Sequence, residues 1–432
     1  MAAPPSATRG PDSWPDSWYV HSAPPGPAAP SLVGDTAGDV CVVGAGYTGL
    51  SAALTLAERG YDVVVVEAER VGWGASGRNG GQLISGYNKS VSAIARLSGP
   101  DDARRLWALA EEAKALLVGR VERHAIDCAL RWGYINAAAK PRHRTGLLTQ
   151  LVDAQALGYD QLRLVEGERL RALVASPRYH SGLEDSGSGH LHPLAYAQGL
   201  ARAARAAGVR LHEKTPAVAI DAGAAPKVTT PLGRVRARFL VLAGNAYLGD
   251  LARPLTRTLV PIATYMLATE PLGAERAVAL LPGDHAVSDT NVGLHYFRRT
   301  ADHRLLFGGG VNFANRAAAG AQARLTRALR HCFPQLAGVA VSHFWHGSVG
   351  MTVNRLPQLG RLSPTTYFAH GYSGHGVALS GICGQLLAEA LSGQAERFDV
   401  FARLPHQSFI GPPWRVPLLA LGSLWYRLRD LL

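Results

Sequence analysis

A glycine-rich turn near the N-terminus has the spacing of a dinucleotide-binding fingerprint. Residues 44–49 read GAGYTG, which is the G-x-G-x-x-G pattern. In this pattern Gly44 permits a tight turn, Gly46 lets the backbone approach a pyrophosphate, and Gly49 allows the next helix to pack closely on the strand. Glu67 follows about twenty residues later, where a carboxylate accepts hydrogen bonds from ribose hydroxyls. The chemistry indicated is the binding of an adenine dinucleotide that has no 2′-phosphate.

The segments on either side of this turn predict a strand–helix–strand unit. We expect a short apolar strand at residues 39–43, a helix at 47–59 and a valine-rich strand at 62–67. A strand that is apolar throughout is typical of a parallel sheet covered on both faces. The start of the helix would direct free N–H groups and the positive end of its dipole toward the phosphates. The complete unit favours a ligand site over a bare glycine-rich turn.

Two further glycine-rich segments bear on the choice between flavin and nicotinamide dinucleotides. Residues 72–82 read GWGASGRNGGQ, and their arginine and two amides can donate to a flat ligand; the alternative is a mobile surface loop. Residues 371–376 read GYSGHG and open the last clear helix, expected at 376–391. A helix N-terminus aimed at a flavin pyrimidine would stabilise negative charge on the reduced ring, and the alternative is a simple capping turn. With the fingerprint, these segments favour FAD.

The periodicity of the remaining chain predicts the elements that must position these segments. We expect helices near 101–124, 143–157, 193–207 and 320–332, and strands near 130–138, 209–242, 258–310 and 341–351. The expected fold class is α/β, with a Rossmann-like FAD-binding domain and an inserted substrate domain on a mixed or antiparallel sheet. The expected divisions are a flexible arm at 1–33 (of which 17–19 could dock on the body), the FAD-binding domain at 34–90, 180–257 and 340–400, the substrate domain at 91–179 and 258–339, and a C-terminal extension at 401–432.

Charge and cysteine usage narrow the class of protein. The 432 residues carry a formal net charge of +12 at pH 7, but the arginines are scattered and no basic run indicates a nucleic-acid partner. The four cysteines are far apart, so we expect neither a metal site nor a disulfide framework. His190 and His192 would share one face of a strand, but without a third ligand a structural role is favoured over a metal pair. Residues 1–32 do not resemble a signal peptide and the apolar stretch 416–426 is too short to span a bilayer, so we expect a cytoplasmic protein without an integral membrane segment.

Several segments spread almost from end to end of the chain carry a resemblance to one family of flavoenzymes. They are residues 17–19, 44–49, 74–82, 189–194, 243–247, 269–272, 296–298, 304–309, 371–376 and 426–430. The chain resembles the glycine oxidase and D-amino-acid oxidase superfamily of FAD-dependent oxidoreductases, and within it the gamma-glutamylputrescine oxidase branch. Residues 78–82, which read RNGGQ, are much more specific than the nucleotide fingerprint.

The resemblance implies a bound FAD and the oxidation of a C–N bond. In the named branch the substrate is a putrescine with one amine capped by a gamma-glutamyl group; the free amine becomes an imine and then an aldehyde, and oxygen becomes hydrogen peroxide. The expected FAD contacts are Gly44, Gly46, Tyr47, Thr48, Gly49, Glu67, Ala75, Ser76, Arg78, Asn79, Gly80, Gly81, Gln82, Val218, Gly244, Gly374, His375, Gly376 and Val377. The residues expected to act on the substrate or the flavin are Arg78, His375, Tyr296 and Arg298.

Three departures from the relatives bear on the chemistry. Residues 346–352 contain no cysteine and Trp73 stands where some relatives have a histidine, so the FAD is expected to be bound non-covalently. Ala378 stands where the sarcosine-oxidase branch has a lysine for the substrate carboxylate, which disfavours a small N-methyl amino acid. That branch also uses a lysine in its substrate domain to promote the reaction with oxygen, but no lysine follows Lys227 here. The sequence does not identify a residue that would replace it.

The candidate substrate residues each have a structural alternative. Arg298 or Arg299 could pair with the carboxylate of the glutamyl cap, and the alternative is a solvated charge on a strand. Tyr296, together with Tyr265, could line an amine pocket or pack in the core. His375 could contact the flavin or stabilise its own loop.

Three functions follow from this reasoning. The first is an FAD-dependent amine oxidase that acts on a small-molecule amine, with gamma-glutamylputrescine as the leading substrate and oxygen as acceptor. The second is an FAD-dependent amine or amino-acid dehydrogenase that uses another electron acceptor, and the third is a flavin-binding protein with a structural or regulatory role. Peroxide release separates the first two, and substrate-dependent bleaching of the flavin separates both from the third. The oligomeric state is not determined by the sequence.

Overall fold

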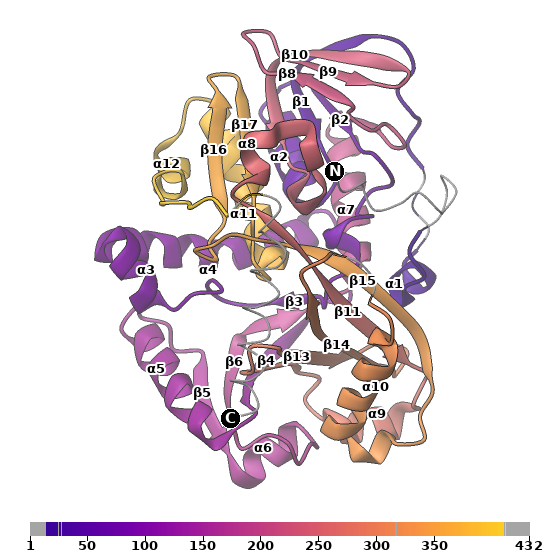
Figure 1. Ribbon diagram of the computed structural model, residues 1–432, viewed down its shortest axis with the longest axis vertical. Helices are drawn as coiled ribbons and strands as arrows, with labels where there is room; N and C mark the ends of the chain where they lie inside the picture. The colour runs from indigo at the N-terminus through magenta and orange to yellow at the C-terminus, as the bar shows by residue number, and fades with distance from the viewer. Residues whose placement is uncertain (1–13, 25, 27, 316–317, 410, 412–432) are drawn as a thin grey trace.

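The fold consists of two sheets, each with its own helices, in the computed structural model shown in Figure 1. The structure describes residues 14–24, 26, 28–315, 318–409 and 411. The predicted apolar stretch 416–426 and the motif at 426–430 lie outside the described residues. One sheet, called sheet A, lies at the top of Figure 1 and the second, sheet B, lies below it, with helix α4 (Pro100–Arg123) running across the middle. This arrangement confirms the predicted α/β class.

Sheet A is the doubly wound unit. Strands β17, β10, β1, β2 and β7 run parallel in that order, and β16 adds an antiparallel edge. All four residues of β2 are buried, which is why this strand is a continuous apolar run. The strands are β1 (Thr36–Val43), β2 (Val63–Val66), β7 (Arg210–His212), β10 (Gly233–Leu242), β16 (Gln358–Ser363) and β17 (Thr366–His370), with β8 (Ala219–Asp221) and β9 (Lys227–Thr230) extending from the start of β10.

Helices α2 (Tyr47–Glu58), α7 (Pro193–Ala206), α11 (Gly376–Leu391) and α4 pack together over one face of sheet A. Their apolar side chains and those of the sheet form one core. The first three helices agree with the predicted ranges to within one residue. In the described part of the chain no single helix is long and apolar enough to cross a bilayer; a bent pair, α11 with α12 (Glu396–Ala402), meets that test together, and its apolar residues lie in this core.

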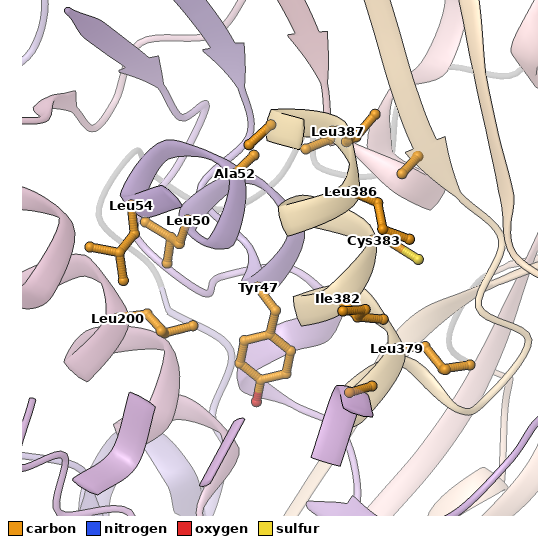
Figure 2. Packing of buried hydrophobic residues seen from close by; sticks show 14 of the residues in the cluster. Tyr47, Leu50, Ala52, Leu54, Leu200, Leu379, Ile382, Cys383, Leu386 and Leu387 are labelled. Atoms are coloured by element: carbon orange, nitrogen blue, oxygen red, sulfur yellow. The ribbon is translucent and has the colours of Figure 1, made fainter. Parts of the chain in front are cut away.

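Helices α2 and α11 approach each other closely in this core. Figure 2 shows Leu50 and Leu54 on α2, and Ile382 and Leu386 on α11, within one apolar cluster. A Cβ on Gly384 of α11 would lie only 2.4 Å from the carbonyl oxygen of the second residue of α2. Glycine at this position therefore fixes the start of α2 against α11.

Sheet B is mixed and mostly antiparallel. Its strands follow the order β15-β11-β14-β13-β12-β4-β6-β3, β5 pairs with β6, and β12 pairs with β4 in parallel. Helices α6 (Gly167–Leu173), α9 (Ala274–Leu280) and α10 (Ala321–Cys332) cover one face and share a second core with it. The strands are β3 (Gln82–Leu83), β4 (Arg131–Ala138), β5 (Leu162–Glu166), β6 (Ser181–His190), β11 (Val260–Thr269), β12 (Ala286–Asp289), β13 (His295–Arg299), β14 (Leu305–Asn312) and β15 (Val341–Met351). The remaining helices are α1 (Trp18–Ser22), α3 (Val91–Ser98), α5 (Arg144–Gln155) and α8 (Arg253–Thr256).

Two long strands differ from the predicted divisions of the chain, and residues 17–19 of the predicted arm are docked on the body. Strands β6 and β15 fall in segments predicted for the FAD-binding domain, but both pair within sheet B. Their partners are distant in the sequence, so periodicity does not reveal them. In the predicted N-terminal arm, α1 is docked: Trp18 and Tyr19 are buried, and the Tyr19 ring makes an edge contact with Trp345 of β15.

The contact between α2 and α11 predicts a graded effect of two glycine substitutions. Gly384→Ala should destabilise the protein by about 1–3 kcal/mol, because the added methyl group overlaps backbone and side-chain atoms of α2. Gly381→Ala in the same helix is the matched control, since a Cβ there would come no closer than 3.8 Å to Arg120. Thermal unfolding, followed by circular dichroism, should give a lower midpoint temperature for Gly384→Ala than for the natural protein, and no decrease for Gly381→Ala. Equal midpoint temperatures for the two variants would contradict the packing argument.

Candidate active site

Each of the three fingerprint glycines at the turn from β1 to α2 has its own reason to lack a side chain. Gly44 has a φ of 108°, which residues with a Cβ rarely adopt. A Cβ on Gly46 would lie 2.9 Å from the Ser76 Oγ, and a Cβ on Gly49 would lie 1.9 Å from the Gly44 carbonyl oxygen. The turn excludes side chains at all three positions, and α2 begins without a side-chain cap. This end of α2 therefore suits a phosphate group.

Glu67 follows β2, and its carboxylate holds the turn closed. Its Oε2 accepts a hydrogen bond from the Ala45 N–H at 2.7 Å, and its Oε1 accepts one from the Glu69 N–H at 3.0 Å. Burial raises the pKa of the Glu67 carboxyl, and the two backbone N–H groups oppose that shift. A carboxylate has about four acceptor sites, so this one can still accept from hydroxyl donors and fits the ribose of an adenine dinucleotide.

Residues 72–82 form a folded loop, which we call the flavin loop, and not a mobile segment. The Ser76 Oγ accepts the N–H of Tyr47 at 3.0 Å and so ties the loop to the start of α2. The Asn79 amide closes the loop on itself, because its Nδ2 donates to the Ser76 carbonyl at 3.1 Å and its Oδ1 accepts from the Gly81 N–H at 2.7 Å. The loop is therefore positioned before any ligand contacts it.

Arg78 and Gln82 connect the flavin loop to sheet B. The buried Arg78 guanidinium lies over the Trp73 indole, 4.1 Å from the ring centroid, and its Nη1 donates to the His346 carbonyl of β15 at 3.3 Å. The Gln82 Nε2 donates to the Val287 carbonyl of β12 at 3.0 Å. The Trp73 Nε1 is buried and has no hydrogen-bond partner among the described residues. That N–H is a donor suited to a bound group.

His375 is the residue immediately before α11 and contacts Gly86, which lies just beyond the flavin loop in the sequence. Its Nδ1 is buried without a hydrogen-bond partner in the described part of the chain. Burial lowers the pKa of His375 to about 4, partly offset by a hydrogen bond to the backbone of Gly86, so the imidazole is neutral at pH 7. Gly374 before it has a φ of 103°, and the Tyr372 hydroxyl lies 2.6 Å from the Thr48 Oγ1 of α2. The two glycine-rich turns of sheet A are thus in direct contact.

Strand β13 places two of the predicted residues against the flavin loop. A Cβ on Gly80 would lie 2.9 Å from the Tyr296 ring, and one on Gly308 would lie 2.2 Å from it, so the ring fits between two glycines. Burial raises the pKa of Tyr296 to about 12. The buried Arg298 donates through Nε to the Gly80 carbonyl at 2.8 Å and through Nη2 to the Tyr19 hydroxyl at 3.2 Å. Its contacts are those of a positioning residue, and pairing with a substrate carboxylate stays a prediction.

The remaining predicted cofactor residues are less closely grouped. Gly244 follows Ala243, whose carbonyl oxygen lies 3.0 Å from the position of a Cβ on Gly44. Gly376 and Val377 are the first two residues of α11 and lie at the junction between this helix and the glycine-rich turn before it. Val218 has 58% of its surface exposed and lies just before β8, outside the contacts described above.

Three other residues considered for the site have structural partners. The His192 Nδ1 accepts an N–H from the first turn of α7 and caps that helix. The His190 Nε2 lies 2.7 Å from the Asp284 carbonyl oxygen. The Tyr265 ring stacks on Phe344, with 5.9 Å between centroids. These contacts account for His192 and Tyr265 without a ligand, whereas the His190 Nδ1 is buried without a hydrogen-bond partner among the described residues.

A buried polar network beside the flavin loop was not predicted. Lys114 of α4 donates to the Ser85 Oγ at 2.5 Å and to the Gly187 carbonyl at 2.8 Å, and it pairs with Glu111 at 2.8 Å. The Asp185 carboxylate of β6 accepts from the same serine at 3.3 Å. The signal available in the sequence was that Lys114 occupies a position of α4 that helical periodicity makes apolar. By itself, a lysine predicts only a solvated charge.

A cavity of about 450 Å³ lies next to these residues. It is lined by His375, by residues 84–91 after the flavin loop, and by parts of α3, α4, α5, β4 and β6. Tyr134 and Asn136 of β4 face it, and burial raises the pKa of Tyr134 to about 12. Its volume is within the range of small-molecule sites. The glycine turns, the Glu67 carboxylate and the two orphaned ring N atoms fit FAD, and His375 also lines this cavity.

Comparison with known proteins agrees with this geometry. A family model described as FAD dependent oxidoreductase, DAO, matches residues 39–390. The chain is 43% identical over 396 residues to gamma-glutamylputrescine oxidoreductase of Escherichia coli strain K12, which covers 91% of this chain and 93% of that protein. It is 26% identical over 431 residues to D-amino acid dehydrogenase 2 of Pseudomonas aeruginosa, with 86% of this chain and 99% of that protein covered. The crystal structure of glycine oxidase from Geobacillus kaustophilus has the same fold, with a TM-score of 0.74 at 23% identity over 87% of this chain and 100% of that chain.

The contacts of Glu67 predict that its charge is needed for cofactor affinity. Glu67→Gln leaves one oxygen acceptor where the carboxylate has two, so the dissociation constant for FAD should rise about tenfold to a hundredfold. Fluorescence titration of the cofactor-free protein with FAD measures this change. The control is Glu69→Gln, because that partly exposed carboxylate pairs with Lys214 at 3.4 Å instead of closing the turn. Equal affinities of the two variants would contradict the assignment of Glu67.

Buried neutral histidines predict a loss of stability in acid. Burial lowers the pKa of His190, His192 and His370 to about 3 in each case. A lowered folded-state pKa stabilises the fold above the unfolded value of about 6.5, and that contribution is lost as the pH falls toward 3. Each such histidine should make the free energy of unfolding fall by about 1.4 kcal/mol per pH unit below about 6.5.

His370→Gln tests this pH dependence at a single site. The His370 Nε2 lies 2.7 Å from the Gln358 Oε1, so an amide can keep a hydrogen bond there without titrating. Urea unfolding between pH 4 and pH 7 should give a pH slope that is smaller by about one proton than in the natural protein. His331→Gln, at an exposed position on α10, is the matched control for the substitution itself. An unchanged slope in His370→Gln would mean that this residue does not resist protonation in the folded state.

Proposed function

The chain belongs to the DAO family of FAD-dependent oxidoreductases, and we propose that it oxidises the free amine of gamma-glutamylputrescine. The observation that carries the proposal is the 43% identity to the Escherichia coli enzyme across 91% of this chain. The match of the family model to residues 39–390 includes the elements around the cavity as well as the nucleotide turn. Family membership also confirms the predicted FAD cofactor and the predicted oxidoreductase class, which sets aside a purely structural role.

The residues of the chain hold the cofactor and orient the amine. Bound FAD supplies a two-electron oxidation that turns the amine C–N bond into an imine, which water then converts to an aldehyde and ammonia. The N-terminal ends of α2 and α11 carry the positive ends of their helix dipoles and favour negative charge beside them. His375 is neutral at pH 7 and therefore adds no positive charge that would repel an amine in the cavity.

His375 and Tyr134, two of the ionisable groups that line the cavity, are poorly suited to take a proton from a substrate amine near pH 7. The pKa of His375 is lowered to about 4 and that of Tyr134 is raised to about 12, so neither exchanges a proton easily near pH 7. A primary alkylamine has a pKa near that of lysine, about 10.4. We therefore infer that the amine loses its proton to solvent before it reacts, and that the rate of oxidation rises with pH.

We propose oxygen as the electron acceptor, with release of hydrogen peroxide. One observation favours a separate acceptor instead: no lysine follows Lys227, so strands β11 to β15 of sheet B contain none. The distant relative in Pseudomonas aeruginosa is a dehydrogenase. The buried guanidinium of Arg78, between the flavin loop and β15, is the cation that supports the oxygen proposal.

We propose the cytoplasm as the compartment of the reaction and a small-molecule amine as the partner. All four cysteines are free and buried, as in proteins that fold under reducing conditions.

Anaerobic mixing with gamma-glutamylputrescine tests the proposed function. The flavin absorbance near ~450 nm should bleach, and more rapidly at pH 9 than at pH 7, because more of the amine is then neutral. Uncapped putrescine, at the same concentration, is the control substrate. Admission of air should restore the absorbance and produce hydrogen peroxide; restoration only by an added electron carrier would favour the dehydrogenase. Flavin that stays oxidised with gamma-glutamylputrescine would exclude this substrate.

A further inference from the structure

Helix α1 and strand β15 bring together three side chains of the kinds that bind metal ions. Figure 1 shows α1 beside β15, and the imidazole rings of His21 of α1 and His343 of β15 lie 4.8 Å apart between centroids. Asp16, just before α1, adds a carboxylate whose Oδ1 lies 3.8 Å from the His21 Nε2. One ligand atom from each side chain lies within 4.8 Å of the other two. Among the described residues, no other group of histidine, cysteine and acidic side chains has this spacing.

Hydrogen bonds to the protein leave one ring nitrogen of each histidine with a lone pair. The His21 Nδ1 lies 3.0 Å from the Ser17 carbonyl oxygen, which can only accept, so this nitrogen carries the proton. The His343 Nδ1 lies 2.9 Å from the Ser342 Oγ, and that hydroxyl donates to the Thr269 carbonyl at 2.8 Å, so its oxygen accepts from the ring. A histidine that binds a metal ion commonly donates its other ring N–H to an oxygen in this way.

The spacing and the ligand types suit a transition-metal ion. Two imidazoles on one tetrahedral Zn²⁺ ion have their centroids about 5 Å apart, because each Zn–N bond is about 2.0–2.1 Å long. The separation between His21 and His343 is close to this value. The side chains of His21 and Asp16 are 57% and 75% exposed, so an ion can reach them from solvent. Imidazole nitrogens favour Zn²⁺ over Mg²⁺ or Ca²⁺, which bind oxygen ligands.

We propose that Asp16, His21 and His343 bind one Zn²⁺ ion, with water as a fourth ligand, and that this ion fastens α1 to the edge strand β15. The cysteine spacing predicts no metal site, but this cluster contains no cysteine. Helix α1 also supplies Tyr19, whose hydroxyl accepts from Arg298, the residue that holds the flavin loop. The ion therefore stabilises the docked position of a helix that supports this loop. None of the three ligands lines the cavity described above, so the site is independent of the proposed function.

Calorimetric titration of the FAD-bound protein with ZnCl₂ tests this site. The protein carries no purification tag and is treated with a chelator, which is then removed. The natural protein should bind one Zn²⁺ ion per chain, and Asp16→Ala, His21→Ala and His343→Ala should each weaken binding at least about tenfold. His331→Ala is the matched control, because it removes an exposed histidine of α10 that lies outside the cluster.

The outcomes separate a built site from general binding at surface histidines. Weakened binding in the three ligand variants, with natural affinity in His331→Ala, supports the site. No saturable binding by the natural protein, an unchanged affinity in either His21→Ala or His343→Ala, or an equal loss in His331→Ala would overturn it. X-ray absorption at the zinc edge of the loaded natural protein tests the site without any variant. Two imidazole ligands are expected there, and a spectrum with one or none would contradict the proposal.

Discussion

The closed turn between β1 and α2 is the constraint on which the rest of the site depends. The Glu67 carboxylate fixes the Ala45 N–H, and the absence of a Cβ on Gly49 allows α2 to lie against the carbonyl of Gly44. Through Ser76 the same turn positions the flavin loop. If this turn opened, the start of α2 would no longer be fixed relative to the flavin loop. The contact between α2 and α11 would then be lost as well.

Buried arginines join the two sheets at the site. Arg78 reaches from the flavin loop to β15, and Arg298 reaches from β13 back to the Gly80 carbonyl of that loop. A buried guanidinium is costly unless its donors are used, and both arginines direct them at backbone carbonyls. Arg298 also donates to Tyr19, so the N-terminal helix α1 takes part in the same junction. The position of sheet B over the flavin loop thus depends on hydrogen bonds and not on apolar packing alone.

Local signals in the sequence were sufficient for the fingerprint, for the longer helices α2, α4, α5, α7, α10 and α11, and for the valine-rich strand β2, because turn geometry and periodicity are local properties. The pairing of β6 and β15 within sheet B was not predictable in this way, since their partners are distant in the chain. The contacts of Arg298 and the position of Lys114 were missed for the same reason.

The cavity borders both the turn before α11 and helix α5, and these two parts of its lining are positioned by different contacts. The flavin loop and the turn before α11 are built on the ends of sheet A strands and are held by closed networks, as at Asn79. Helix α5, in contrast, lies in the connection between β4 and β5 and contributes no residue to those networks. Substitutions on the cavity-lining face of α5 are therefore expected to leave the dinucleotide turn and the flavin loop in place.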